Sequence, residues 1–106
     1  MARLLLKKGT PQTTDVNIQK SNRVAVDFPR EDSNISGPYY SIRVGALDAE
    51  TVDISINQGE WIPCRHSSGY WWYDWANFKA GTYQLVARAR IGGQTDVSKI
   101  RKFTAE

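Results

Sequence analysis

The sequence predicts an all-β fold, an antiparallel sandwich or barrel, and three observations support this prediction. Residues 81–90 alternate, with Tyr83, Leu85, Ala87 and Ala89 on one face, and this period of two is typical of a strand with one buried face. About eight short segments of this kind are separated by turn signals roughly every eight to twelve residues. No segment shows the i, i+3, i+4, i+7 apolar spacing of an amphipathic helix.

Composition places the chain among ordinary globular domains and argues against a nucleic-acid-binding or a membrane-spanning protein. Its 106 residues, 41% of them hydrophobic and 24% charged, can form one domain with its own core. The net charge is +3, but the Lys and Arg residues are scattered and form no nucleic-acid-binding motif. No segment approaches the roughly 20 apolar residues of a membrane span. The lone Cys64 excludes an intrachain disulfide.

The first part of the chain predicts short strands joined by loops. Residues 3–8 could form a short strand, which Gly and Pro then break. Residues 15–19 and 24–28 alternate around a turn signal at 20–22, which predicts a hairpin or a two-part first strand. Residues 29–38, bounded by prolines and rich in turn formers, predict a loop.

The middle of the chain predicts three strands. Residues 39–47 place Tyr40, Ile42 and Val44 on one face, and residues 51–57 place Val52, Ile54 and Ile56 inward. Asn57-Gln58-Gly59 predicts a hairpin turn, because Asn and Gly tolerate positive φ. Residues 61–66 then form the return strand, and Pro63 in it predicts an edge position.

The aromatic strand that follows dominates the sequence, since residues 69–75 hold three of the four tryptophans. Its faces are Tyr70/Trp72/Asp74 and Trp71/Tyr73/Trp75. One face must pack on the core, and the other is exposed or lies under another segment of the chain.

The last part predicts a crossover at 76–81, the strand 81–90, a Gly92-Gly93 hairpin and a final strand at 94–104. Tyr83, just after Gly81, predicts a tyrosine corner whose hydroxyl bonds a backbone group across the crossover.

Residues 23–106 resemble a bacterial immunoglobulin-like or fibronectin type III-like domain of the early-set kind. The matching segments are Ser36-Gly37-Pro38, residues 52–61, Trp75 and the Ala-Gly-Thr-Tyr-Gln-Leu-Val-Ala-Arg-Ala run at 80–89. The resemblance implies an immunoglobulin-like β-sandwich of seven to nine strands, but it says little of function, because such sandwiches host many roles. The absence of a disulfide pair departs from the antibody type. Residues 1–22 have no counterpart, so they are expected to be an N-terminal arm or an extra strand.

Two candidate binding features emerge. The first is an aromatic platform for a partner protein or a polysaccharide, drawn from Trp71, Trp72, Tyr73, Trp75 and Tyr39. The second is the apolar arm Leu4, Leu5 and Leu6, which could be a first strand of the same sandwich, exchange with another copy, or be disordered.

No catalytic or metal-binding pattern accompanies these features. Cys64 and His66 share a strand face without the further ligands or third group that zinc binding or catalysis requires. We therefore expect no enzyme, no metal and no cofactor. The leading hypothesis is a non-catalytic structural or interaction module that self-associates through sheet edges or the arm, and the alternative is a carbohydrate-binding module.

The chain shows no signal peptide. An extracellular or cell-envelope location would follow only if the opening methionine replaces a removed signal.

Overall fold

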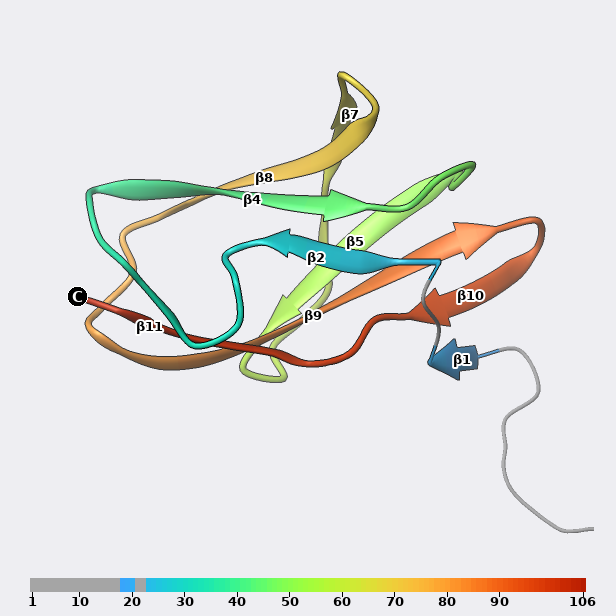
Figure 1. Cartoon of the computed structure of the whole chain (residues 1–106). Helices are drawn as coiled ribbons and strands as arrows, with labels where there is room; N and C mark the ends of the chain where they lie inside the picture. The colour runs from blue at the N-terminus through green and yellow to red at the C-terminus, as the bar shows by residue number, and fades with distance from the viewer. Residues whose placement is uncertain (1–17, 21–22) are drawn as a thin grey trace, which may run out of the picture.

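The computed structural model describes residues 18–20 and 23–106, and side chains from residue 23 onward. This part of the chain contains eleven strands and no helix, so it holds no helix that could cross a membrane (Figure 1). In chain order the strands are β1 Ile18–Lys20, β2 Ala25–Phe28, β3 Ser33–Ile35, β4 Tyr39–Gly45, β5 Thr51–Ile56, β6 Ile62–Pro63, β7 Arg65–Ser67, β8 Tyr70–Ala76, β9 Gly81–Ile91, β10 Gln94–Val97 and β11 Arg101–Ala105.

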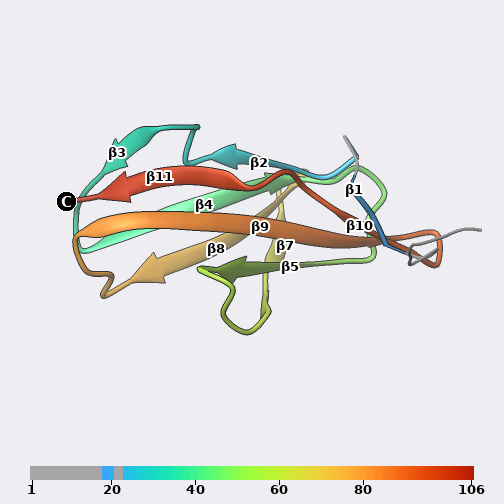
Figure 2. The ribbon, with the colours of Figure 1, turned by 90° about the horizontal axis from the view of Figure 1, so that it is seen from below.

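The strands form two sheets, which confirms the predicted sandwich. In the large sheet, of seven strands, β9 pairs with β10 and β11 and with β5, and β6 extends the β5 side. Figure 2 looks onto this sheet, with β9 running between β11 and β5. The small sheet has the order β2-β4-β8-β7. Most pairings are antiparallel, but β1 on β10 and β3 on β11 are parallel.

The strands outnumber the expected seven to nine because three predicted strands are each divided in two, and because the predicted loop at 29–38 contains a further short strand, β3, which pairs with β11. Residues 61–66, predicted as one strand, divide at Cys64 into β6, which pairs with β5, and β7, which pairs with β8. The final strand divides near Ser98 into β10 and β11, which both stay in the large sheet and pair with β9. The first strand does not form a hairpin: β1 joins the large sheet and β2 the small one, while residues 21–22 lie outside the described residues.

The core lies between the sheets, where the predicted inward faces are confirmed. Ile42, Val44, Ile54 and Leu85 are fully buried. Apolar burial of this kind is the main favourable term in folding. The core comprises Val24, Val26, Ile35, Ile42, Val44, Ala46, Val52, Ile54, Trp71, Leu85, Ala87, Ala89, Ile91, Phe103 and Ala105.

The predicted hairpin turns and the edge position are confirmed. Asn57 and Gln58 have positive φ of 52° and 60°, and Gly92 and Gly93 have φ of 56° and 83°, as tight primed turns require. Pro63 lies in β6, which pairs only with β5, so its missing N–H costs no ladder bond.

The predicted tyrosine corner is present. The Tyr83 hydroxyl donates to the Lys79 carbonyl oxygen at 2.6 Å, across the connection from β8 to β9. The bond fixes the connection between the sheets, because it ties the loop to the start of β9.

An ion pair between a half-exposed arginine and a buried carboxylate ties the segment before β2 to β10. The Asp96 side chain is fully buried, and the Arg23 guanidinium donates to its two oxygens at 2.8 and 3.0 Å. A buried carboxylate needs such a partner, since an unpaired buried charge is costly.

Candidate functional site

Strand β8 divides the aromatic residues between the core and the surface. Trp71 is 8% exposed, and Tyr73 and Trp75 are half-buried against the core. Alternate residues point to opposite faces of a strand, so Tyr70, Trp72 and Asp74 lie on the outer face of the small sheet.

Trp75 belongs to an aromatic cluster that closes one end of the core. Its ring stacks on Phe78 at 4.3 Å and meets Tyr83 and Phe103 edge-on at 4.8 and 5.8 Å. Tyr83 and Phe103 also stack on each other at 5.7 Å. Aromatic pairs in such geometries add stability beyond the area they bury. Trp75 therefore has a structural role.

Across the outer face of the small sheet runs a row of four residues, Phe28, Arg43, Trp72 and Arg65, one from each strand. Phe28 faces Arg43 across β2 and β4, Arg43 faces Trp72 across β4 and β8, and Arg65 faces Trp72 across β7 and β8. Residues directly opposite on antiparallel strands share a face. We call this set the aromatic–arginine row.

A bulge in β2 supplies two of the three groups that hold Arg43. The register shifts between Val26 and Phe28, so Asp27 and Phe28 together oppose one residue of β4. The Arg43 Nε donates to Asp27 Oδ2 at 3.2 Å, and the guanidinium lies 4.7 Å from the Phe28 ring centroid. It also lies 4.0 Å from the Tyr70 ring centroid. Arg43 is thus held between two rings and a carboxylate.

A second polar group borders the row on β8. Asp74 accepts hydrogen bonds from Ser41 Oγ at 3.0 Å and from Arg65 Nη2 at 3.1 Å. These bonds, that from Arg65 first, lower the pKa of the Asp74 carboxyl below its usual value. Asp74 therefore stays an acceptor over a wide pH range.

Tyr39 lies at the start of β4 and is 62% exposed. It shares the outer face with Ser41 and Arg43 by alternation. Its cross-strand neighbour is Ala76, however, and this pair lies two residues along the strands from the pair of Ser41 and Asp74. Tyr39 therefore belongs to the outer face without contacting the row.

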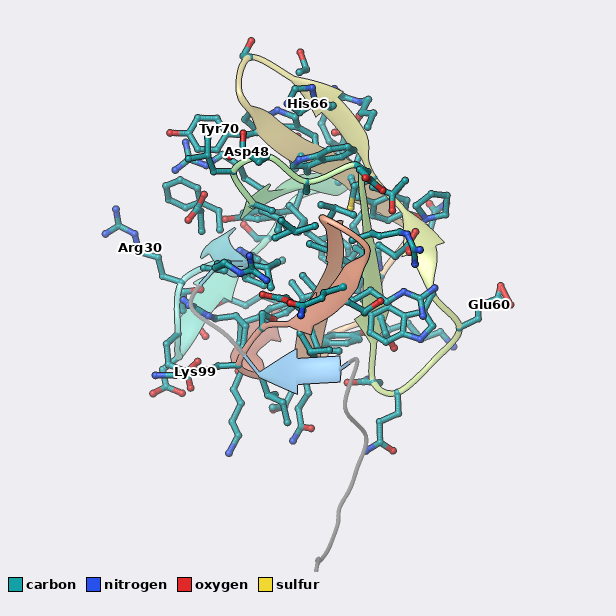
Figure 3. All side chains as sticks on the ribbon, turned by 90° about the vertical axis from the view of Figure 1, so that its right-hand side faces the viewer. Arg30, Asp48, Glu60, His66, Tyr70 and Lys99 are labelled. Carbon is teal, nitrogen blue, oxygen red and sulfur yellow. The ribbon has the colours of Figure 1, made fainter. Side chains whose placement is uncertain are left out.

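A groove of about 850 Å³ opens at the end of the small sheet, beside Tyr70. Its lining includes Asp27, Arg43 and Tyr70, together with Leu47 and Asp48 from the turn after β4. Figure 3 shows the labelled Tyr70 and Asp48 side chains on the same side of the molecule, away from Lys99 and Glu60.

Cys64 and His66 are held in ways that suit packing. Burial, aided by the charge of Asp53, raises the pKa of the Cys64 thiol to about 12, so it carries almost no thiolate near neutral pH. The His66 ring packs on Trp71 at 4.7 Å between centroids. Within the described residues no group of three His, Cys, Asp or Glu side chains could hold a metal ion.

Solved structures resemble the chain closely in fold. Clostridium thermocellum CbhA fibronectin(III)-like modules match with a TM-score of 0.65 and 17% identity, over 77% of this chain and 93% of theirs. The fold is fibronectin type III-like. An engineered protein also matches, with a TM-score of 0.65 and 19% identity, over 90% of this chain and 21% of its own.

A modular endo-β-1,4-mannanase from Cellulomonas fimi also matches, with a TM-score of 0.61 and 16% identity, over 78% of this chain and 18% of its own. The chain thus spans only about a fifth of the mannanase and of the engineered protein. No protein-family model matches it, and neither does any curated protein sequence. At these identities the likeness shows the fold alone.

The structure separates the predicted platform residues. Trp71, Tyr73 and Trp75 point inward, and only Trp72 and Tyr39 lie on the outer face. Leu4, Leu5 and Leu6 lie outside the described residues, so the arm stays a prediction. The same holds for the domain boundary at residue 22, although β1 already adds to the edge of the large sheet.

Sequence reasoning did not include Phe28 and Arg43 in the candidate site, although alternation in residues 39–47 placed Arg43 on the face away from the core. The two residues lie on strands far apart in the sequence, and only the register of β2, β4 and β8 joins them to Trp72. A second signal was the alternation of β8, which already grouped Tyr70 with Trp72.

Proposed function

We propose that this chain is a non-catalytic interaction module that binds a protein partner, another copy of itself or a second protein, through the outer face of its small sheet. The aromatic–arginine row carries the proposal. Tyr70 remains 37% exposed beside it, and Arg65 and Asp74 are exposed. Trp, Tyr and Arg are the residues most enriched at binding hot spots.

The row is also held in place before any partner arrives. Asp27 fixes Arg43, Asp74 fixes Arg65, and the Trp72 indole N–H donates to the Ser67 carbonyl oxygen at 2.9 Å. Side chains that are already ordered lose less conformational entropy on binding, so more of their contact energy appears as affinity.

The free sheet edges support face binding over edge pairing. The edge strands are all short: β6 and β7 have two and three residues, with Pro63 at the end of β6, and β1, β2 and β3 have three or four. Short edges with Pro or charged side chains disfavour pairing with another chain. The arm at Leu4, Leu5 and Leu6 stays in the proposal as a second route to assembly, because β1 shows that this end of the chain adds to a sheet edge.

Light scattering after size exclusion tests this proposal on the full chain, on a chain lacking residues 1–14, and on Trp72→Ala. The matched control is Trp61→Ala, since Trp61 is 37% exposed on the other side of the molecule and stacks on Arg88 at 4.3 Å. We expect a mass that rises with concentration for the full chain and for Trp61→Ala, and a lower mass for Trp72→Ala. Monomer masses for all four proteins at every concentration would refute self-association. A lower mass for the truncated chain alone would assign assembly to the arm.

A second candidate, carbohydrate binding, is favoured by one observation. The outer face combines exposed rings with ordered acceptors and donors, namely Tyr39 and Tyr70 with Asp74 and Ser41. Sugar rings stack on aromatic side chains and bond their hydroxyls to such groups. The likeness to a modular mannanase is compatible with this role but shows only the fold. Either a polysaccharide or a cell-surface partner would place the module outside the cell or in the cell envelope.

Tryptophan fluorescence during titration with a panel of soluble polysaccharides tests the second candidate. Binding on the outer face should change the emission of the wild-type chain and of Trp61→Ala, but not of Trp72→Ala. An unchanged wild-type spectrum with every polysaccharide would remove carbohydrate binding from the outer face.

A further inference from the structure

We infer that the groove at the end of the small sheet is a binding site for a neutral oligosaccharide. The inference rests on the proposed function of a non-catalytic binding module and deepens its second candidate. The proposed site is the groove rather than the flat outer face, and the proposed ligand is an uncharged sugar chain.

The charges that line the groove disfavour a strongly ionic ligand. Arg23, Arg43, Asp27 and Asp48 line it, so two formal positive charges meet two formal negative charges. Both arginines are already paired, Arg23 with Asp96 and Arg43 with Asp27. An anionic ligand would have to displace one of these partners, and a cationic ligand would have only the Asp48 carboxylate to pair with, beside two arginines. A neutral hydroxyl can bond to a charge-paired group without breaking the pair.

One acceptor in the groove is available. The Asp48 side chain makes no hydrogen bond or ion pair within the described residues. Asp48 also has a positive φ of 65°, a conformation uncommon outside Gly, Asn and Asp. It follows Leu47, which is 84% exposed. A carboxylate beside an exposed apolar side chain suits a ligand that offers hydroxyl donors and C–H groups together.

Tyr70 supplies an aromatic wall. Its ring packs on the Arg43 guanidinium at 4.0 Å and meets Trp72 edge-on at 6.3 Å, and it still keeps 37% of its surface exposed. The apolar face of a pyranose ring, where C–H groups point the same way, matches the negative face of such a ring.

The size and floor of the groove fit a short sugar chain. About 850 Å³ lies within the range of small-ligand sites. Gly45 lies in its lining, and a Cβ there would come within 3.1 Å of Asp27 Oδ2. A side chain at this position would crowd the Asp27 carboxylate and reduce the space between Asp27 and Tyr70.

The test is a titration of the full ¹⁵N-labelled chain with mannohexaose, cellohexaose and xylohexaose, each followed by amide shifts and calorimetry. Hexagalacturonate and the chitosan hexamer serve as anionic and cationic probes. We expect at least one neutral hexaose to shift the amides of Leu47, Asp48, Gly69 and Tyr70, and the charged probes to bind less tightly.

Four variants assign the site. Tyr70→Ala and Asp48→Ala should each weaken the neutral hexaose at least about tenfold, which corresponds to roughly 1.4 kcal/mol. Tyr70→Phe keeps the ring and should bind within a few-fold of wild type. Trp61→Ala is the matched control, because Trp61 has the same exposed fraction as Tyr70 and also stacks on an arginine. It should bind like wild type.

The outcomes separate this inference from the proposed function. No shift with any neutral hexaose, tighter binding of a charged probe, or equal affinity of Tyr70→Ala and Trp61→Ala would overturn the groove site. Amide shifts confined to Tyr39, Ser41 and Asp74 would also overturn the groove site, but they would support sugar binding on the outer face. The proposed protein-binding role is decided independently by the masses of the Trp72→Ala and truncated chains.

Discussion

Replacing Trp75 with alanine is expected to destabilise the fold strongly, although the sequence alone makes Trp75 a candidate ligand-binding residue. The change removes ring contacts at 4.3 Å with Phe78, 4.8 Å with Tyr83 and 5.8 Å with Phe103. Each aromatic pair contributes about 0.5–1.5 kcal/mol, so the three together contribute about 3 kcal/mol. Adding the cavity left in the core gives an expected loss of about 3–5 kcal/mol in the free energy of unfolding.

Urea unfolding followed by far-ultraviolet circular dichroism measures this loss without depending on tryptophan emission. The midpoint should fall while the slope m stays constant, because the surface exposed on unfolding changes little. The melting temperature should fall by about 12–20 °C. Trp72→Ala is the comparison, since it loses one exposed hydrogen bond to Ser67 and one ring contact. We expect it to lose only about 1 kcal/mol.

Two results would refute this reasoning. A loss below about 1 kcal/mol for Trp75→Ala would mean that the cluster does not close the core, given the usual cost of truncating a packed aromatic residue. Equal losses for Trp75→Ala and Trp72→Ala would mean that β8 does not divide its rings between core and surface.

Three further predictions concern the rest of the fold. Tyr83→Phe removes the 2.6 Å bond to Lys79 and should cost about 1 kcal/mol in urea unfolding, and no change in midpoint would dismiss the corner as a stabilising bond. Cys64, with its pKa raised from 9.0 to about 12, should react with iodoacetamide at pH 8 about 10³-fold more slowly in the folded chain than in urea, and equal rates would contradict its burial. The same shift means that the folded chain holds the thiol proton more tightly than the unfolded chain. The contribution of Cys64 to the free energy of unfolding is therefore fully present below pH 9.0 and is lost as the pH rises toward about 12. This fall in stability with pH should be shallower in Cys64→Ala. Arg23→Met removes the guanidinium that pairs with the buried Asp96 carboxylate and should lower the urea midpoint more than Asp96→Asn with Arg23→Met together, whereas a greater fall in the double variant would show that the pair is not what holds this segment.

Alternation made much of the fold predictable from the sequence. The faces of β5 and β9 follow directly from the apolar period of two, and Leu85 and Ile54 are fully buried as this pattern predicts. The turns at 57–59 and 92–93 were equally predictable, because few residues accept their positive φ.

The change of sheet at Cys64 was not predictable. Residues 61–66 read as one strand, and the division into β6 and β7 depends on which sheet each half meets. That choice is made by long-range packing, which local propensity does not encode.

The candidate site was predictable only in part. Strand β8 is aromatic on both faces, so alternation could group Tyr70 with Trp72 but could not say which group faces the core. The partners of Trp72, which are Arg43 and Arg65, and the bulge that adds Phe28 depend on strand register. Register follows from the whole sheet rather than from any one segment.

Hydroxyl-radical footprinting with mass spectrometry tests the central claim most directly, namely that β8 turns one set of rings inward and presents the other outward. In the free protein, oxidation should be high at Tyr39 and Tyr70, lower at Trp72, and least at Trp71, which is 8% exposed. Oxidation of Trp71 as fast as that of Tyr70 would contradict the account, because both faces of the strand would then be open to water.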